Sequence, residues 1–275
     1  MTSGGTLRGG TGPGAGAPKG VAGVVLVAHG GQEASTGPTG PLQPAVLRMI
    51  PVAAAIRSAL RGSDVEVRRP RFRLRGWNGA QASPVGDLNE ELDALTAAYG
   101  SVPVVLVGHS MGARAAIRAA GHPAVSAVAG LAPWLPPGEP VGQLAGRRVL
   151  VAHGTADRVT SPAETWAYVA RAREVTQVAA IEIKDGDHPM LRRASLWHAI
   201  AAEFARSALE VPAGNRALES ALRADSAGPP RVVLLSALCA PPFGSVDDQP
   251  ILAAAIRRLT GLVTLIADWA DAGSA

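Results

Sequence analysis

The stretch VVLVGHSMGARAA, residues 104–116, decides the fold that the rest of the chain must complete. Its apolar start is typical of a central parallel strand covered on both faces, and its alanine-rich end is typical of a helix. Between them, GHSMG (108–112) matches G-x-S-x-G in the strand-to-helix setting that gives this pattern its meaning. We predict that Ser110 is held at the tip of a strained turn and serves as a nucleophile. An ordinary strand-to-helix turn is the alternative.

Apolar runs and helical patterns alternate on both sides of this stretch. Such alternation predicts a parallel sheet with right-handed crossovers and helices on both faces. We therefore expect a three-layer α/β/α sandwich with a mostly parallel sheet of about six strands. The expected strands lie within residues 21–30, 64–77, 102–110, 125–134, 147–157 and 177–188, and the expected helices within 42–62, 84–100, 111–121, 161–175 and 190–209.

Two of the helical segments carry local signals. Pro51 lies inside the segment 42–62 and predicts a kink or a break into two helices, because proline lacks an N–H and its ring clashes with the preceding turn. Ser161 is followed by a proline and, three positions on, by Glu164, which is the signature of a helix N-cap. Both signals set helix boundaries from local chemistry alone.

The chain divides into three parts. Residues 1–20 are rich in glycine and predict a flexible leader, without the apolar core of a secretory signal. The alternating pattern fills residues 21–210, which we expect to form the main domain. Residues 211–275 break the pattern with a linker-like segment and an apolar helical stripe from Leu252 to Ile266. A C-terminal helical extension is expected there, and docking on the main domain, a mobile tail and contact with a partner remain alternatives.

The charge pattern argues against a nucleic-acid partner. The 275 residues carry a formal net charge of +4, and the basic residues are nearly all arginines scattered among acids. In the densest basic cluster, every arginine except Arg68 alternates along the expected strand over 64–77 or its exit, so a solvated strand face or edge is the main interpretation. A patch for phosphate or acidic substrates is the alternative. The cluster consists of Arg68, Arg69, Arg71, Arg73 and Arg75.

Several other classes of protein are excluded by what the chain lacks. No stretch of about 18 uncharged apolar residues occurs, so no membrane span is predicted. Cys239 is the single cysteine, so an intrachain disulfide is impossible, and a cytoplasmic location is expected. Neither H-E-x-x-H nor a cysteine cluster is present, so we predict no metal and no cofactor.

A serine hydroxyl is a poor nucleophile at neutral pH without a base beside it. Asp157, in HGTADRV, and His188, in DGDHPM, each follow an expected strand, downstream of Ser110. We predict that His188 takes the serine proton and that Asp157 holds the imidazole in the correct tautomer. Asp185 and Asp187 are rival acids but share the loop of the histidine itself. The remaining histidines considered, His153, His122 and His198, are expected to have structural, surface or helix-packing roles.

Acyl transfer also needs hydrogen-bond donors for the oxyanion of the tetrahedral intermediate. One expected donor is the backbone N–H of Met111, directly after the serine. The other is expected in AHGGQEAS, the loop after the first strand, where Gly31 is the first choice and Gly30 the second. A simple glycine turn is the alternative interpretation of this loop.

The motifs HGG, GHSMG, HGTADRV and DGDH stand in the order and spacing of the α/β-hydrolase superfamily, which the chain resembles over roughly residues 21–210. It looks like the small actinobacterial-type members near the carboxylesterase, dienelactone-hydrolase and prolyl-oligopeptidase-like groups. The resemblance implies an α/β-hydrolase fold, but the usual first antiparallel pair of strands is missing. Only LPPGEPVGQLAGR follows the strand that ends at Trp134, where the family usually inserts a lid, so no large lid is expected.

These motifs predict a serine hydrolase that cleaves a carboxylic ester or thioester of a small-molecule acyl substrate through an acyl-enzyme. Trp134 and Gly30 are candidates for lining the substrate pocket, whereas Trp77 is expected to pack in the core. An acyltransferase or peptidase-like activity with the same residues is one alternative. A non-catalytic binding module on a hydrolase scaffold is another, because a fold alone does not fix function.

Overall fold

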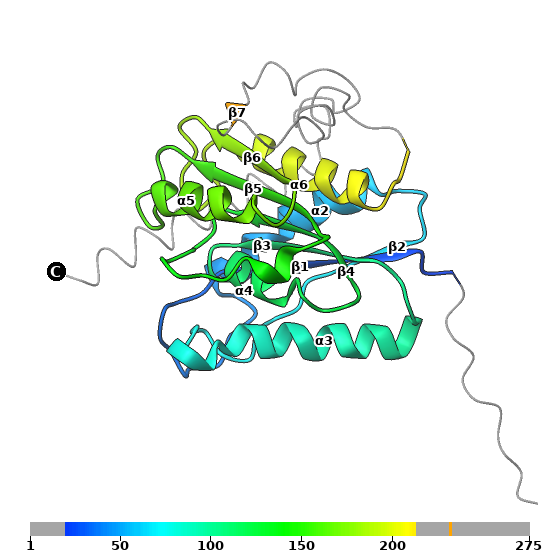
Figure 1. The fold of residues 1–275 in the computed structure, drawn as a ribbon. Coiled ribbons are helices and arrows are strands. Elements are labelled where there is room, and N and C mark those ends of the chain that lie inside the picture. The colour runs from blue at the N-terminus through cyan, green and yellow to red at the C-terminus, as the bar shows by residue number, and fades with distance from the viewer. Residues whose placement is uncertain (1–19, 213–230, 233–275) are drawn as a thin grey trace, which may run out of the picture.

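The computed structural model describes residues 20–212 and 231–232 of the chain (Figure 1). Its strands form one sheet in the order β2-β1-β3-β4-β5-β6-β7, and every neighbouring pair is parallel. The six expected strands are present, and the two-residue strand β7 extends one edge of the sheet. The strands are β1 (Gly23–Ala28), β2 (Val65–Arg68), β3 (Val104–His109), β4 (Val125–Leu131), β5 (Arg148–Gly154), β6 (Val178–Ile183) and β7 (Arg231–Val232).

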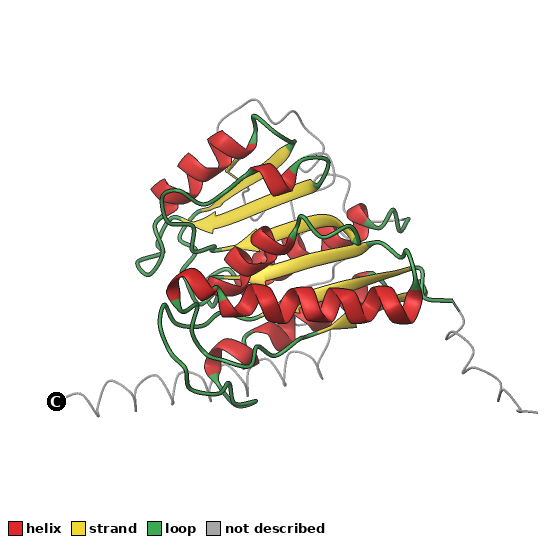
Figure 2. Ribbon diagram, turned by 60° about the horizontal axis from the view of Figure 1, so that its bottom comes forward, coloured by secondary structure: helices red, strands yellow, loops and turns green. Residues whose placement is uncertain are grey.

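Helices cover both faces of the sheet, which gives the expected three layers (Figures 1 and 2). α2 and α6 lie side by side on one face, and α3, α4 and α5 cover the other. The helices are α1 (Pro44–Leu47), α2 (Met49–Ala59), α3 (Ser83–Tyr99), α4 (Met111–Ala119), α5 (Pro162–Ala172) and α6 (Ala194–Ala208), with short 3-10 helices η1 (Gly79–Gln81) and η2 (Gly142–Leu144).

The central strands are buried on both faces, which explains their continuous apolar sequences. On β1, Val25 and Val27 pack in the cluster under α2 and α6, whereas Val24 and Leu26 pack in the cluster under α3, α4 and α5. This alternation follows from the two-residue period of a strand. β1 and β3 therefore need apolar side chains at every position, as their sequences have.

The strand expected over residues 64–77 is shorter than predicted. β2 ends at Arg68, and the following residues form a loop that is hydrogen bonded to the loop after β1, with the Gln32 N–H 2.9 Å from the Arg75 carbonyl oxygen. Pro70 has no N–H for a ladder, which explains why the alternating pattern does not continue as a strand. The arginines here form surface ion pairs, as the solvated interpretation predicts: Arg68 with Glu66 and Glu91, and Arg73 with Asp87 and Glu90.

The local helix signals are confirmed. The segment 42–62 is broken, and α1 ends at Leu47, the residue whose carbonyl would have accepted the missing N–H of Pro51. Ser161 caps α5, with its Oγ accepting the Glu164 N–H at 3.2 Å.

The connection from β4 to β5, residues 132–147, contains only η2, so no large lid is inserted there. Within the described residues, no helix combines the length and the apolar character needed to cross a bilayer. The expected leader, apart from residue 20, and the expected helix between Leu252 and Ile266 lie outside the described residues.

Candidate active site

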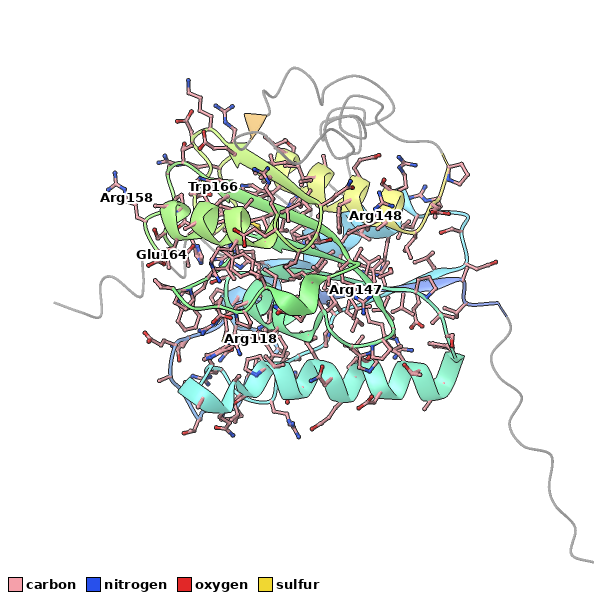
Figure 3. The ribbon with its side chains drawn as sticks, in the orientation of Figure 1. Arg118, Arg147, Arg148, Arg158, Glu164 and Trp166 are labelled. Carbon is pink, nitrogen blue, oxygen red and sulfur yellow. The ribbon has the colours of Figure 1, made fainter. Side chains whose placement is uncertain are left out.

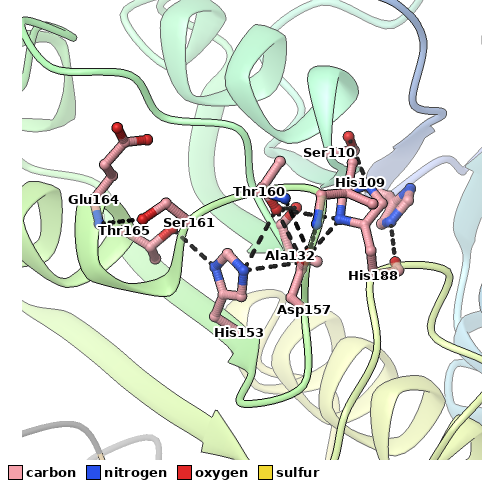
Figure 4. Close-up of polar contacts among 11 residues, drawn as sticks. His109, Ser110, Ala132, His153, Asp157, Thr160, Ser161, Glu164, Thr165 and His188 are labelled. Carbon is pink, nitrogen blue, oxygen red and sulfur yellow. Dashed lines mark hydrogen bonds and ion pairs between the residues drawn. The ribbon is translucent and has the colours of Figure 1, made fainter.

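The three residues expected to carry the chemistry meet at one edge of the sheet. Ser110 follows β3, Asp157 follows β5 and His188 follows β6, and parallel strands present their carboxyl ends at the same edge. His188 Nε2 lies 3.0 Å from Ser110 Oγ, and His188 Nδ1 lies 2.8 Å from Asp157 Oδ2 (Figure 4). All three residues are less than a tenth exposed. The structure thus brings together a hydroxyl, an imidazole and a carboxylate in a hydrogen-bonded row.

The backbone at Ser110 has the strained conformation that the sequence predicts. Its φ of 55° and ψ of −120° lie outside the regions that a residue with a side chain normally adopts. The turn is kept in place by a 3.1 Å hydrogen bond from the Ser110 N–H to the Leu131 carbonyl oxygen. A Cβ at Gly108 would overlap the backbone of Gly112, and a Cβ at Gly112 would overlap the His29 carbonyl group. Glycine at both positions is therefore required for β1, β3 and α4 to meet around the serine.

The Asp157 carboxylate accepts hydrogen bonds at both oxygens. Oδ1 accepts from the backbone N–H groups of Val159, at 2.8 Å, and Thr160, at 3.0 Å. Oδ2 accepts from His188, from the Thr160 hydroxyl at 2.9 Å, and from His153 Nε2 at 3.0 Å. Burial opposes ionisation, but the hydrogen bonds from the two histidines and from the Thr160 N–H hold the pKa of Asp157 well below its usual value. The carboxylate is therefore both ionised and fixed in orientation.

His153, expected to be a structural histidine, is a second imidazole partner of Asp157. It is fully buried at the end of β5, and its Nδ1 lies 2.9 Å from Thr165 Oγ1 on α5. Sequence reasoning placed it at a strand end but did not connect it to the carboxylate. The available signal was its spacing, because His153 at the end of β5 is only four positions before Asp157 in the turn that follows.

His109, the residue before the serine, packs against His188. Their ring centroids are 4.9 Å apart, and His109 Nε2 lies 2.8 Å from the His188 carbonyl oxygen. Because a carbonyl oxygen only accepts, Nε2 carries the proton. Burial lowers the pKa of His109 well below its usual value, and the charges of Arg48 and His188 act in the same direction. His109 thus fixes the backbone that carries His188, a role that sequence reasoning missed.

The residues expected to supply the oxyanion donors are Met111, directly after Ser110, and the glycines of the loop after β1. Met111 is the first residue of α4, so its N–H has no acceptor within the helix. A Cβ at Gly31 would overlap the Met111 side chain and the Arg75 carbonyl oxygen, and a Cβ at Gly30 would lie 3.3 Å from Ser110 Cβ. The loop after β1 therefore passes close to Ser110 at Gly30 and close to Met111 at Gly31.

His29 orders this glycine loop from within the core. The Phe72 N–H donates to His29 Nε2 at 3.1 Å, so the ring proton of the neutral histidine is on Nδ1, which donates to the Gly30 carbonyl oxygen at 2.6 Å. Burial is the largest influence on His29 and lowers its pKa. Gly30 and Gly31 are thus held in place despite their lack of side chains.

Trp134, a candidate for the substrate pocket, packs against an ion-pair cluster next to the serine. The Arg114 guanidinium lies 4.4 Å from the Trp134 ring and 3.9 Å from the Trp77 ring. Arg114 in turn pairs with Glu139, which is 2% exposed. Trp134 is half-buried, and its backbone N–H donates to the Ser110 carbonyl oxygen at 3.3 Å. Trp77 packs in the core as expected.

A cavity of about 420 Å³ opens beside His188, between the loops after β5 and β6. Val159, which is 71% exposed, supplies part of its apolar wall. Arg158 extends outward from the loop before α5 (Figure 3). The cavity is lined by Ala156, Arg158, Val159, Asp187, His188, Pro189 and Arg192.

Comparison with known proteins agrees with this architecture. A family model described as an alpha/beta hydrolase domain matches residues 77–211, which include Ser110, Asp157 and His188. Residues 77–211 are therefore similar to an alpha/beta hydrolase domain, and the fold of the chain is that of the α/β-hydrolases. No curated protein matches the chain.

Several solved structures share this fold at low sequence identity. An alpha-beta serine hydrolase homologue from Coxiella burnetii is 19% identical, with a TM-score of 0.50, over 68% of this chain and 88% of that chain. Est1E from Butyrivibrio proteoclasticus is 12% identical, with a TM-score of 0.50, over 71% and 91%. An arylesterase is 11% identical, with a TM-score of 0.52, over 70% and 78%.

Proposed function

We propose that the protein is a serine hydrolase that cleaves a carboxylic ester or thioester through an acyl-enzyme. The observation that carries this proposal is the row of hydrogen bonds from Ser110 Oγ through His188 to Asp157 Oδ2. Stability of the fold does not require a strained serine, an imidazole and a buried, ionised carboxylate to lie in hydrogen-bond contact. Together they provide an activated nucleophile.

In the first half of the reaction, Ser110 Oγ attacks the acyl carbon while its proton moves to His188 Nε2. Asp157 stabilises the imidazolium that forms, and its hydrogen bond with His188 Nδ1 keeps this nitrogen protonated. The oxyanion accepts hydrogen bonds from the Met111 N–H and from the loop after β1, with Gly31 as the donor. His188 then gives its proton to the leaving alcohol or thiol, and the acyl group remains on the serine.

In the second half, water takes the place of the leaving group. His188 accepts a proton from this water, whose oxygen attacks the acyl carbon, and the acid product leaves as Ser110 recovers its proton. Each residue therefore acts twice in the cycle, and His188 alternates between base and acid. No metal or cofactor is needed for any of these steps.

The surroundings of Ser110 favour a small substrate. The connection between β4 and β5 forms no lid, and the cavity beside His188 has a volume of about 420 Å³, which suits a short acyl or alcohol group. Trp134 is not among the residues that line this cavity, but its position next to Ser110 keeps it a candidate for contacting the substrate. We therefore propose that the substrate is a soluble, short-chain ester or thioester.

The test is a fluorophosphonate labelling experiment combined with a panel of p-nitrophenyl esters of increasing chain length. We expect labelling at Ser110 and the highest kcat/KM for short acyl chains, and expect both to disappear in Ser110→Ala. Ser58→Ala, which removes an exposed hydroxyl from α2, is the matched control and should behave as the parent protein. Absence of labelling in the folded protein would contradict the proposal and favour a binding module. Products formed with added alcohols or amines would identify an acyltransferase.

A further inference from the structure

His153 and Thr165 continue the row of hydrogen bonds beyond Asp157 (Figure 4). Thr165 Oγ1 lies 2.9 Å from His153 Nδ1, and His153 Nε2 lies 3.0 Å from Asp157 Oδ2. Both side chains are fully buried. The row thus runs from the first turn of α5 to Ser110 on the far side of His188, and two imidazoles share one carboxylate oxygen.

The direction of each hydrogen bond in this extension follows from its acceptor. An ionised carboxylate only accepts, so His153 must carry a proton on Nε2. In the neutral ring Nδ1 is then an acceptor, and the Thr165 hydroxyl is the group positioned to donate to it. Thr165 therefore selects the ring tautomer that can donate to Asp157.

We propose that His153 and Thr165 are positioning residues for the hydrolytic reaction: the Thr165 hydroxyl fixes the orientation and tautomer of His153, and His153 fixes Asp157 Oδ2 and moderates its interaction with His188. The second effect arises because the donated Nε2–H neutralises part of the charge on Oδ2. The imidazolium of His188 is then stabilised less than it would be by an unshared carboxylate. This assignment rests on the proposed function only for its kinetic consequences.

Asp157 keeps other partners when His153 is replaced. Its Oδ1 still accepts from the N–H groups of Val159 and Thr160, and its Oδ2 still accepts from the Thr160 hydroxyl. The carboxylate is therefore expected to stay near His188 and to gain negative charge at Oδ2. Loss of the His153 donor should make His188 easier to protonate.

The other charged and titratable groups around His188 come from several elements. His109 on β3 packs against its ring in a tilted arrangement, and Arg48, between α1 and α2, interacts electrostatically with His109 and Asp187. Arg158 and Arg192 line the cavity beside it. None of these groups changes in the variants below, so a difference between variants reports on the row from Thr165 to Asp157.

The experiment compares two pairs of variants, His153→Leu with His153→Gln and Thr165→Val with Thr165→Ser. Leucine and valine remove the polar group, whereas glutamine retains an N–H donor and serine retains the hydroxyl. The kinetic measurement is kcat/KM for p-nitrophenyl acetate as a function of pH. A second measurement, independent of activity, follows the protonation of His188 and the tautomer of His153 by NMR of ¹⁵N-labelled histidine.

For His153→Leu we expect the acid limb of the pH profile and the titration midpoint of His188 to move to higher pH by about half a unit or more. We expect kcat to fall by roughly 10- to 100-fold. Asp157 loses one hydrogen bond at Oδ2 and therefore holds the His188 ring less firmly in its reactive orientation. Thr165→Val should produce the same changes to a smaller extent, and the glutamine and serine variants should restore most of both. In the parent protein, the NMR spectrum should show His153 protonated on Nε2.

A purely structural role for His153 would lower the amount of folded protein without moving the acid limb or the midpoint, and this result would overturn the inference. His153 protonated on Nδ1 alone would overturn it as well. If His153→Leu does not fold, the two Thr165 variants decide the question. Absence of hydrolysis in every protein, with the expected NMR shifts present, would overturn the proposed function and leave the positioning of Asp157 supported.

Discussion

His188 Nδ1 lies 2.8 Å from Asp157 Oδ2, although the two residues follow different strands and are 31 positions apart in the chain. The contact sets the tautomer of His188, because the carboxylate requires a proton on Nδ1 and so leaves the lone pair of Nε2 facing Ser110. The rival acids Asp185 and Asp187 lie on the loop of the histidine and have no hydrogen bond to its ring. Asp185 pairs instead with Arg193, at 3.4 Å.

Replacing Asp157 by asparagine should therefore lower kcat strongly. An amide can donate to His188 and stabilise the wrong tautomer, and the expected loss is about 10⁴-fold. Esterase kinetics with p-nitrophenyl acetate would measure it. Asp185→Asn is the matched control and should change kcat less than threefold, within ordinary surface-mutation effects of about 0.5 kcal/mol. Equal losses in the two variants would contradict the assignment of Asp157.

Gly31→Ala should impair catalysis without unfolding the protein. The added Cβ would overlap the Met111 side chain and the Arg75 carbonyl oxygen, so the loop after β1 must move away from Ser110. Displacement of one oxyanion donor is expected to cost on the order of 100-fold in kcat. Gly40→Ala, in the same connection but with open space around the new Cβ, is the control. A parent-like kcat for Gly31→Ala would show that the added Cβ does not displace an oxyanion donor.

Glu139→Gln should destabilise the protein, because Glu139 is the buried partner of both Arg114 and Arg118. Removal of one member of a buried ion pair leaves an uncompensated charge and costs about 3–5 kcal/mol in the free energy of unfolding. Urea unfolding followed by circular dichroism would measure this loss. Glu90→Gln removes an exposed partner of Arg73 and should leave the unfolding midpoint unchanged. A midpoint for Glu139→Gln that matches the parent would show that Arg114 and Arg118 find other partners.

His198 should make the fold sensitive to mild acid. Burial lowers its pKa from 6.5 to about 4, so the folded state favours the neutral ring. The stability from this group is present above about pH 6.5 and is lost as the pH falls towards 4, because the unfolded chain binds the proton first. Between pH 7 and 4.5 the loss would be up to about 2–3 kcal/mol.

The measurement is the free energy of unfolding in urea at several pH values for the parent protein and for His198→Leu. Between pH 7 and 4.5, the free energy of unfolding should fall more in the parent protein than in His198→Leu, by up to about 2–3 kcal/mol. Parallel pH dependences would show that the ring is hydrated in the folded state.

Much of the fold could be predicted because the signals are local. The apolar runs of β1 and β3 specify strands buried on both faces, Pro51 breaks a helix at Leu47, and Ser161 caps α5 through its own hydroxyl. The strand expected over 64–77 was wrong in its second half. Alternation there reflects a loop paired with the connection after β1, and alternation alone does not distinguish a strand from such a loop.

The sequence by itself determined that Ser110, Asp157 and His188 stand at the ends of parallel strands, because strand pattern, glycine spacing and chain order are properties of neighbouring residues. Only the tertiary structure decided which side chains surround them. The contacts of His109 with His188 and of Trp134 with Arg114 depend on the order of strands in the sheet and on how each side chain packs. His153 illustrates this over a short distance. Its position four residues before Asp157 was visible in the sequence, but its ring is directed towards Asp157 by Thr165 on α5, which packs against the sheet.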